Sequence, residues 1–246
     1  ELEENLVFLR PLGLRLAALR TLTEKVFVTS RLFAGYSGAL DADVLAQLIA
    51  ALPQGAPGET AAHKRYDAAA CAVEIPADVG FCALGHNLYA LGSSYSGACP
   101  VLSSLVSYGY LWNMVRVQGG AYGTGMNVRR SGDIFCYSYR DPNLDNTRAV
   151  FSAVADFIED FAAQGMPLDN IIIGAVNTTD PLLDPAGVCE SQCVRALKGV
   201  TPEELAKTRH ELLATKPADL AAMAGVLRKY AREGKFCTFS GTNGGA

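Results

Sequence analysis

Two short segments joined by a polar turn constrain the fold of this chain more than any other feature. Residues 122–128 and 134–139 have the composition of strands, and residues 127–132, which include Arg-Arg-Ser-Gly, supply a turn between them. This pattern predicts a hairpin, and therefore an antiparallel pair. Other predicted elements are strands at 69–75, 79–84 and 235–240 and helices within 96–115, 141–163, 168–199 and 201–232. This order favours the α+β class, with a two-layer antiparallel sheet and helices packed on one face.

The clearest break in the chain is the run Pro-Gln-Gly-Ala-Pro-Gly at residues 53–58, because proline and glycine interrupt regular structure. We therefore predict a linker over residues 53–64 and a C-terminal α+β domain over residues 65–246. Residues 1–52 would be the tail of a preceding domain. That tail is predicted to hold helices at 6–20 and 41–52 and a strand at 26–29. The acidic start resembles no signal peptide, and it lacks an initiator methionine, which favours a piece of a longer polypeptide.

Charge and composition argue against two classes of partner. The net charge is −4 and no basic run occurs, so nucleic acid is not an expected partner. No apolar run reaches the length of a membrane span, so no membrane association is expected. The seven cysteines mostly lie in apolar runs, where a free thiol behaves as a small buried hydrophobe. We expect a reducing compartment, either a bacterial cytoplasm or an organelle matrix.

Motifs for metal binding are incomplete in this sequence. His210-Glu211 begins a possible H-E-x-x-H motif, but alanine stands at position 214 where the second histidine is required, and the reversed motif H-x-x-E-H is also absent. Cys189 and Cys193 have helical spacing and no second ligand pair nearby. We predict no metal site in this chain.

Two further motifs have simpler explanations. The run at residues 92–97 nearly matches the G-x-S-x-G pattern of serine hydrolases, with Ser94 as the nucleophile, but a serine-rich loop that caps a helix explains it equally well. The glycine-rich run at residues 119–125 follows a helix and leads into a strand. Because a dinucleotide loop requires the reverse order, nucleotide binding is not expected.

The segment around Arg116 is the strongest candidate for a functional site. The predicted helix before it has an apolar face made of Val101, Leu102, Leu105, Tyr108, Trp112 and Val115. Arg116 ends this helix, Gly119 and Gly120 follow, and Tyr122 begins the next strand. Glycines beside a cation and a phenol suggest a place where another backbone approaches. The spacing alone is better explained by an arginine favoured by the helix dipole and a tyrosine packed in a sheet.

Longer runs around this segment resemble a known family. Val-Arg-Val-Gln-Gly-Gly-Ala-Tyr-Gly at residues 115–123, with Leu-Trp-Asn before it, resembles the second-half signature of the insulinase/pitrilysin-type (inverzincin) zinc metallopeptidases. The presequence-protease and falcilysin subgroup is the most similar, because residues 138–143 and 201–203 match it as well. The resemblance spans nearly the whole chain and is most specific at residues 99–161. It implies an insulinase/mitochondrial-processing-peptidase-like domain in the C-terminal portion of an enzyme that encloses peptides.

The resemblance also implies roles for single residues. By motif position, Arg116 would hold a substrate carbonyl, and Tyr122 would donate a hydrogen bond to the oxygen on which negative charge develops. Gly119 and Gly120 would let the substrate backbone approach. Zinc would be bound by an H-x-x-E-H motif in the N-terminal half of the same polypeptide, so this chain alone would be inactive.

Three functions follow from these patterns. The leading hypothesis is the C-terminal part of a zinc-dependent oligopeptidase, a metalloendopeptidase, with peptide substrates and the N-terminal half of the same polypeptide as partners. The alternative is a non-catalytic structural or peptide-binding partner subunit of a two-chain peptidase. A serine hydrolase that uses Ser94 is the third.

Overall fold

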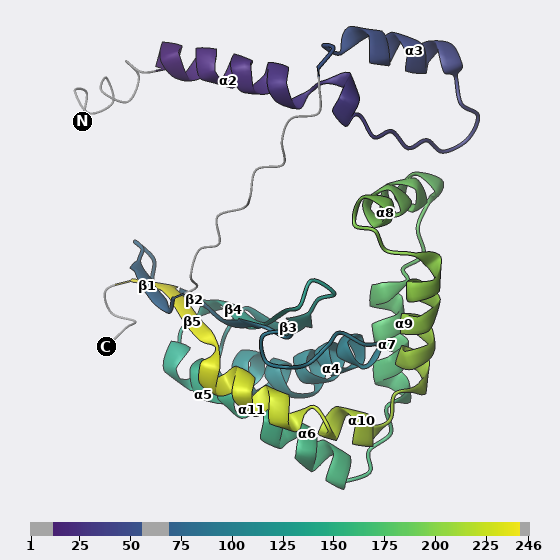
Figure 1. Ribbon diagram of the computed structural model, residues 1–246. Helices are drawn as coiled ribbons and strands as arrows, with labels where there is room; N and C mark the ends of the chain where they lie inside the picture. Colours follow the sequence, from purple (N-terminus) through teal and green to yellow (C-terminus); the bar gives the residue numbers. More distant parts are fainter. Residues whose placement is uncertain (1–11, 56–68, 242–246) are drawn as a thin grey trace, which may run out of the picture. The chain divides into compact units, whose positions relative to one another are not determined.

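The computed structural model describes residues 12–55 and 69–241 (Figure 1). The chain divides into two compact units. The helical unit comprises residues 1–65 and 183–199, and the sheet unit comprises residues 66–182 and 200–246. None of the helices in the described ranges has the length and apolar character needed to span a membrane.

The helical unit contains α2 (Leu12–Val26), the short 3₁₀-helix η1 (Thr29–Arg31), α3 (Ala42–Ala51) and α8 (Pro185–Leu197). The helix predicted at 41–52 is confirmed, and the one predicted at 6–20 is confirmed over its described part, since residues 6–11 lie outside the described residues. The strand predicted at 26–29 is wrong, because α2 extends through Val26 and η1 begins at Thr29. Of the predicted linker, only residues 53–55 are described.

Five strands form the sheet of the sheet unit, in the order β1-β5-β2-β4-β3. They are β1 (Cys71–Glu74), β2 (Gly80–Asn87), β3 (Gly123–Val128), β4 (Asp133–Asp141) and β5 (Lys235–Ser240). The β3–β4 hairpin is confirmed, and β2 runs antiparallel to β4 and to β5. However, β1 runs parallel to β5, so the sheet is mixed and the prediction of a purely antiparallel sheet is wrong. These two strands come from opposite ends of the unit, and no hairpin dictates their relative direction.

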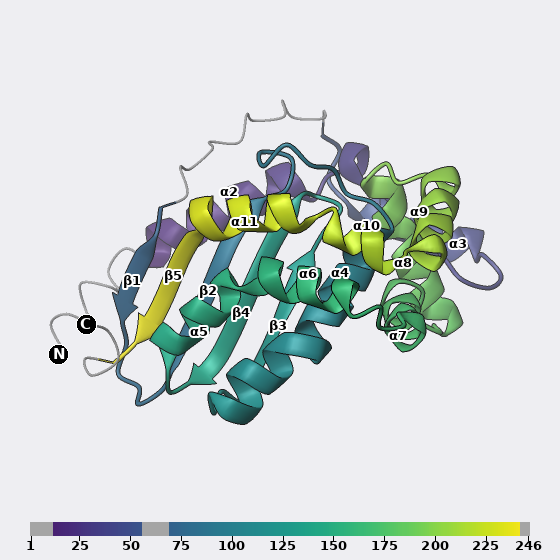
Figure 2. The same cartoon turned by 90° about the horizontal axis from the view of Figure 1, so that it is seen from below.

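The helices of the sheet unit cover one face of the sheet or lie beside it, which confirms the α+β class (Figure 2). They are α4 (Ala98–Val106), the π-helix η2 (Ser107–Gln118), α5 (Leu144–Ser152), α6 (Val154–Ala163), α7 (Asp169–Thr179), α9 (Pro202–Ala214), α10 (Pro217–Ala221) and α11 (Ala224–Glu233). The core forms where Leu84, Ile134 and Cys136 of the strands meet Phe151 and Tyr230 of the helices.

The two faces of the sheet differ in character. The helix-covered face carries Cys82, Leu84, Met126, Val128, Ile134, Cys136 and Ser138, all of which are buried. The open face carries the opposite set from the same strands: Val73, Phe81, Phe135, Tyr137, Tyr139 and Phe239, with Gly123 and Gly125 among them. Val73, Phe81, Tyr139 and Phe239 are each 38–43% exposed. The open face is therefore apolar and aromatic without being a second core.

Side-chain caps begin only some helices of the sheet unit: α4, whose start the serine-rich loop was expected to cap, has Gly97 at its N-cap and no side-chain cap. Thr201 and Glu204 form the predicted capping box at the start of α9. The predicted cap at Asp141 is wrong, because Asn143 caps α5 through its side chain. The Asp141 carboxylate is instead buried and accepts hydrogen bonds from Ser138 Oγ (2.6 Å), Thr147 Oγ1 (2.6 Å) and the Asn143 N–H (2.8 Å). It ties the end of β4 to α5.

Candidate functional site

Arg116 lies near the end of an unusually wound helix. α4 continues directly into η2, in which hydrogen bonds span five residues instead of four. Because a π-turn holds more residues than an α-turn, residues four apart along η2 lie more nearly above one another. Tyr108, Trp112 and Arg116 therefore share one side of η2, and all three line the same pocket.

This winding explains why the predicted apolar face of the helix is only partly right. The positions in α4 and Val115 are buried as predicted, whereas Tyr108 is 71% exposed and Trp112 is 41% exposed. The prediction assumed α-helical spacing throughout, which turns positions 108 and 112 toward the core. With π-spacing, Leu111 and Val115 point inward together, and the two aromatic residues turn toward the pocket.

The Trp112 ring supports the Arg116 side chain. The Arg116 guanidinium carbon lies 3.9 Å from the centre of the Trp112 ring, within the range of a cation–π contact. Arg116 itself is half-buried. The stacking limits the positions that the guanidinium can adopt, so its donors have a defined direction.

The two glycines after η2 shape the turn that leads to Tyr122. A side chain at Gly119 would lie 2.5 Å from the Val115 carbonyl oxygen, and Gly120 has a φ of +83°, which favours glycine. The Ala121 N–H then donates to the Val115 carbonyl (3.1 Å). Both glycines have a local role in ending the helix, and neither lines the pocket. That they admit a substrate backbone stays a prediction.

Tyr122 follows this turn at the start of the hairpin. Its N–H donates to the Arg140 carbonyl (3.2 Å), which fixes its backbone to β4. Its ring lies 5.6 Å from the Tyr139 ring, and the guanidinium carbon of Arg140 lies 5.5 Å from its centre. The side chain is 59% exposed. The backbone of Tyr122 is therefore fixed, while more than half of the residue remains exposed.

Arg116 and Tyr122 line one pocket of about 520 Å³, together with the whole of β3 and the rings of Tyr137 and Tyr139. Arg116 is the only charged side chain among the described residues that line it. Hydroxyl groups of serines, threonines and tyrosines supply most of the remaining polar atoms. A single cation among neutral donors suits a ligand rich in carbonyl groups, such as a peptide.

The floor of the pocket depends on glycines in β3. Gly123 lies opposite Tyr139, and Gly125 lies opposite Tyr137. A side chain at either glycine would meet the tyrosine ring at 3.1 Å or less. The rings therefore lie over the strand, and burial raises the pKa of the Tyr137 phenol. These tyrosines were not predicted as site residues, although the glycine-tyrosine pairing in the hairpin was a readable signal.

The outer edge of β3 is covered by two serines. Ser103 Oγ accepts the Val128 N–H (3.0 Å), and Ser107 Oγ accepts the Met126 N–H (2.9 Å). Edge strands expose unpaired backbone groups, and these serines occupy part of that edge. They also fix β3 to the helix that carries Arg116.

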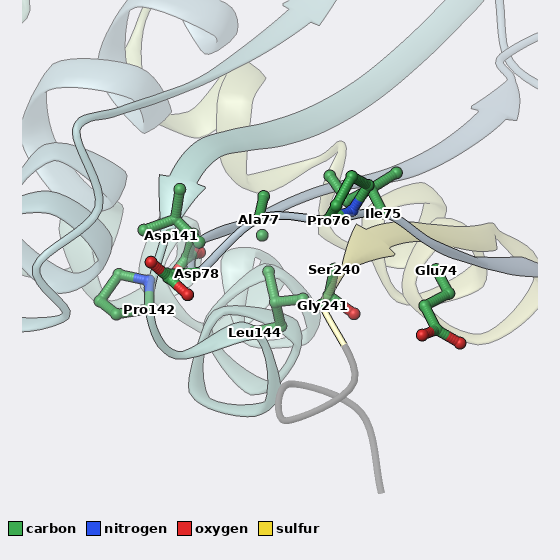
Figure 3. Close-up of a pocket in the computed structure, with 12 residues that line it drawn as sticks. Glu74, Ile75, Pro76, Ala77, Asp78, Asp141, Pro142, Leu144, Ser240 and Gly241 are labelled. Atoms are coloured by element: carbon green, nitrogen blue, oxygen red, sulfur yellow. The ribbon is translucent and has the colours of Figure 1, made fainter.

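A larger hollow of about 830 Å³ lies at the other end of the sheet unit, between residues 74–80, the start of α5 and the end of β5 (Figure 3). Figure 3 shows the Glu74 carboxylate at the opposite end of the hollow from Asp78 and Asp141. The Asp141 carboxylate is already used by three internal donors. The smaller pocket is the better candidate, because it holds both Arg116 and Tyr122, whereas the charged side chains that line this hollow are all carboxylates.

The described residues do not fit a zinc ion. No group of three or more His, Cys, Asp or Glu side chains among them could hold a metal, and His86 Nδ1 accepts the Asn87 N–H (2.7 Å). No hydrogen bond joins Ser94 to a histidine within the described ranges. The loop that carries Ser94 packs against α9 instead, where the Gly97 N–H donates to Glu211 Oε2 (2.8 Å).

Comparison with known proteins agrees with this fold. Residues 71–239 match the family model described as the PreP C-terminal domain. The chain is 34% identical over 154 residues to presequence protease 1, chloroplastic/mitochondrial, from Arabidopsis thaliana, a match that covers 62% of this chain and 14% of that protein. It is 32% identical over 160 residues to protein HypA from Clostridium perfringens, covering 65% of this chain and 16% of that protein.

A solved structure supports the same assignment at the level of fold. The peptidase M16 inactive domain from Pseudomonas fluorescens superposes with a TM-score of 0.60 at 14% identity, and the match covers 94% of this chain and 58% of that one. The chain spans about a sixth of the length of the curated relatives it matches, 16% and 14%. Because the family model covers more than half of the chain, from β1 into β5, the chain belongs to the PreP C-terminal domain family of presequence-protease-like peptidases.

Proposed function

We propose that this chain is the C-terminal part of a zinc-dependent oligopeptidase and supplies two groups that bind the substrate at its reacting carbonyl. The observation that carries the proposal is the shared pocket: Arg116 and Tyr122 come from different elements and line one cavity. Its neutral hydroxyl groups and single cation suit a peptide backbone. Membership of the presequence-protease family supports the reaction class.

The two groups have separate roles in this proposal. Peptide hydrolysis places negative charge on the carbonyl oxygen, and a fixed neutral donor aimed at that oxygen stabilises it. Tyr122 is the proposed donor, because its backbone is fixed and more than half of the residue is exposed. Arg116, directed by the Trp112 ring, holds a neighbouring substrate carbonyl.

Zinc is not part of this chain in the proposal. The described residues hold no suitable ligand set, so the metal and the water that it activates belong to the N-terminal half of the same polypeptide. The partners are therefore that half and the peptide substrate. A bacterial cytoplasm or an organelle matrix is the proposed compartment, in line with the chloroplast and mitochondrial name of the Arabidopsis relative.

We retain the domain organisation as part of the proposal: residues 1–52 belong to a preceding related domain, 53–64 are a linker, and 65–246 are the C-terminal domain. Exposed apolar residues in the helical unit support this division. Leu16, Leu19 and Leu22 of α2 are each more than half exposed. A helix that exposes a row of leucines normally packs against another element.

The test is a pair of variants in the complete, zinc-loaded protein. Tyr122→Phe removes only the hydroxyl and should lower kcat for a quenched fluorogenic peptide about a hundredfold or more. Tyr89→Phe removes a surface hydroxyl that donates to the Arg130 carbonyl, outside the pocket, and should leave kcat unchanged. Equal activity of the two variants would overturn the proposed role of Tyr122.

The alternative function is a non-catalytic partner subunit, and the native protein distinguishes it. Purification from its own cells, followed by mass and zinc analysis, should yield one long chain with one zinc. A chain of about this length that copurifies with a separate zinc-bearing protein would favour the alternative. Labelling of Ser94 by a fluorophosphonate would instead support a serine hydrolase.

A further inference from the structure

One arginine in the hairpin has a backbone conformation that arginine rarely adopts. Arg140 has a φ of 49°, and it is the only non-glycine residue with a positive φ among the described residues. Glycine adopts this conformation freely, and asparagine and aspartate do so occasionally. Other residues seldom do, because their Cβ comes too close to the backbone. The same residue interrupts the strand register: Gly80 pairs with Asp141 and Phe81 with Tyr139, which leaves Arg140 as an extra residue. It is a β-bulge of the kind in which glycine normally occupies the left-handed position.

The bulge is held from both sides. Beyond it, the buried Asp141 carboxylate receives three hydrogen bonds. On the β3 side, the Arg140 carbonyl accepts the Tyr122 N–H (3.2 Å). A glycine would adopt this backbone conformation with less strain. The presence of arginine here therefore points to a role for its side chain.

That side chain lies over the tyrosine proposed to bind the reacting carbonyl. The Arg140 guanidinium carbon is 5.5 Å from the centre of the Tyr122 ring. The centres of the Tyr139 and Tyr122 rings are 5.6 Å apart. Arg140 thus contacts Tyr122 twice, through its carbonyl at the Tyr122 backbone and through its guanidinium at the ring. Bulges are frequent beside active sites, where they redirect a side chain.

We infer that Arg140 is a positioning residue, which uses its bulged backbone and its guanidinium to hold the Tyr122 phenol in its working direction. The inference rests on the function proposed above for Tyr122. Arg140 itself need not touch the substrate. Its effect on turnover should pass entirely through the Tyr122 hydroxyl.

The test removes the Arg140 guanidinium and keeps its backbone contact to Tyr122, in the complete, zinc-loaded protein. Arg140→Gly and Arg140→Asn both keep a backbone that tolerates a positive φ, and both remove the cation. Each should lower kcat about tenfold with little change in KM, whereas Arg140→Lys, which keeps a cation, should recover most of the loss. Arg129→Asn is the matched control, because it removes a similar guanidinium–ring contact, to Phe135 at 5.0 Å, in the same hairpin but outside the pocket.

A double-mutant cycle with Tyr122→Phe decides between positioning and a general structural role. In single-turnover measurements with excess enzyme, Arg140→Gly should have no further effect once the hydroxyl is absent. An equal loss with and without the hydroxyl would overturn the inference, as would unchanged turnover of both Arg140→Gly and Arg140→Asn. If Tyr122→Phe alone is fully active, the proposed function fails as well, so the two failures are distinguishable. Asn serves as the second variant if the glycine variant does not fold.

Discussion

The helix-covered face and the open face of the sheet are built from the same strands but differ in the burial and the contacts of their side chains. In β4, Ile134 and Cys136 are fully buried, whereas Tyr139 on the other face is 38% exposed. On the covered face, Tyr230 of α11 reaches into the sheet, donating to the Leu84 carbonyl (2.7 Å) and accepting the Cys136 N–H (2.9 Å). On the open face, the rings of Tyr137 and Tyr139 lie over Gly125 and Gly123 of the neighbouring strand. Alternation along β4 therefore places core residues on one face and the tyrosines that line the pocket on the other.

The largest test of this separation compares two aromatic truncations. Phe151→Ala, at a fully buried position facing the sheet, should lower the free energy of unfolding by about 3–5 kcal/mol. Tyr108→Ala, at a pocket residue that is 71% exposed, should change it by about 0.5 kcal/mol or less. Urea unfolding followed through Trp112, the only tryptophan in the chain, measures both. Similar losses in the two variants would mean that the side chains around the pocket also carry the fold.

A second test removes one hydroxyl from each face. Tyr230→Phe leaves the Leu84 carbonyl without its donor and the Cys136 N–H without its acceptor, and should cost about 1–3 kcal/mol of unfolding free energy. Tyr139→Phe should cost about 0.5 kcal/mol or less, because Tyr139 is 38% exposed. The same urea experiment applies, and a larger loss for Tyr139→Phe would contradict the comparison.

The third test uses alkaline pH. Burial raises the pKa of the Cys136 thiol to about 12 and that of Cys82 to about 11, from 9.0. The unfolded chain therefore releases these protons first, so their contribution to stability is complete below pH 9 and is lost as the pH rises toward 11–12. The loss is about 1.4 kcal/mol per pH unit for each thiol. Between pH 9 and pH 10.5, unfolding free energy should fall less steeply in Cys136→Ala than in the unmodified chain. Parallel slopes would show that the Cys136 thiol does not titrate on unfolding.

The smallest effect on stability is expected at the floor of the pocket. In Gly123→Ala, the new methyl group would displace the outer part of the Tyr139 ring. Because only the far end of one side chain has to move, the unfolding free energy should change by about 1 kcal/mol or less, while KM for the peptide rises. Gly225→Ala in α11, where nothing lies within 4 Å, is the control and should leave KM unchanged. An unchanged KM in Gly123→Ala would mean that the Tyr139 ring does not shape the site.

Features set by neighbouring residues could be predicted from the sequence. The β3–β4 turn, the capping box at Thr201 and the strands of the sheet unit depend on local chemistry, and the structure confirms them. The parallel pairing of β1 with β5 joins segments more than 160 residues apart, and no local signal encodes it. The Asp141 cap was misassigned because its partners, Ser138 and Thr147, compete for the same carboxylate in the folded state.

The candidate site was predictable only in part, and through the family resemblance instead of local chemistry. Arg116 and Tyr122 were identified through the resemblance, since their spacing alone fits a helix end and a strand tyrosine. The π-winding that turns Trp112 toward Arg116 and the positive φ of Arg140 follow from tertiary packing. The alternation of Gly123 and Gly125 opposite two tyrosines in the hairpin was present in the sequence and could have predicted the floor of the pocket.

The position of β5 between β1 and β2 has a consequence for how the chain acquires its structure. On the ribosome, β2, β3 and β4 can pair soon after α4 and η2 emerge, but β2 keeps an unpaired edge until residues 235–240 are made. β1 has no described neighbour in the sheet except β5, so the earliest strand to be synthesised is the last to be incorporated. Non-local pairings of this kind form slowly. The nascent domain would therefore expose a strand edge through most of its synthesis, the interval in which a chaperone would be of most use to it.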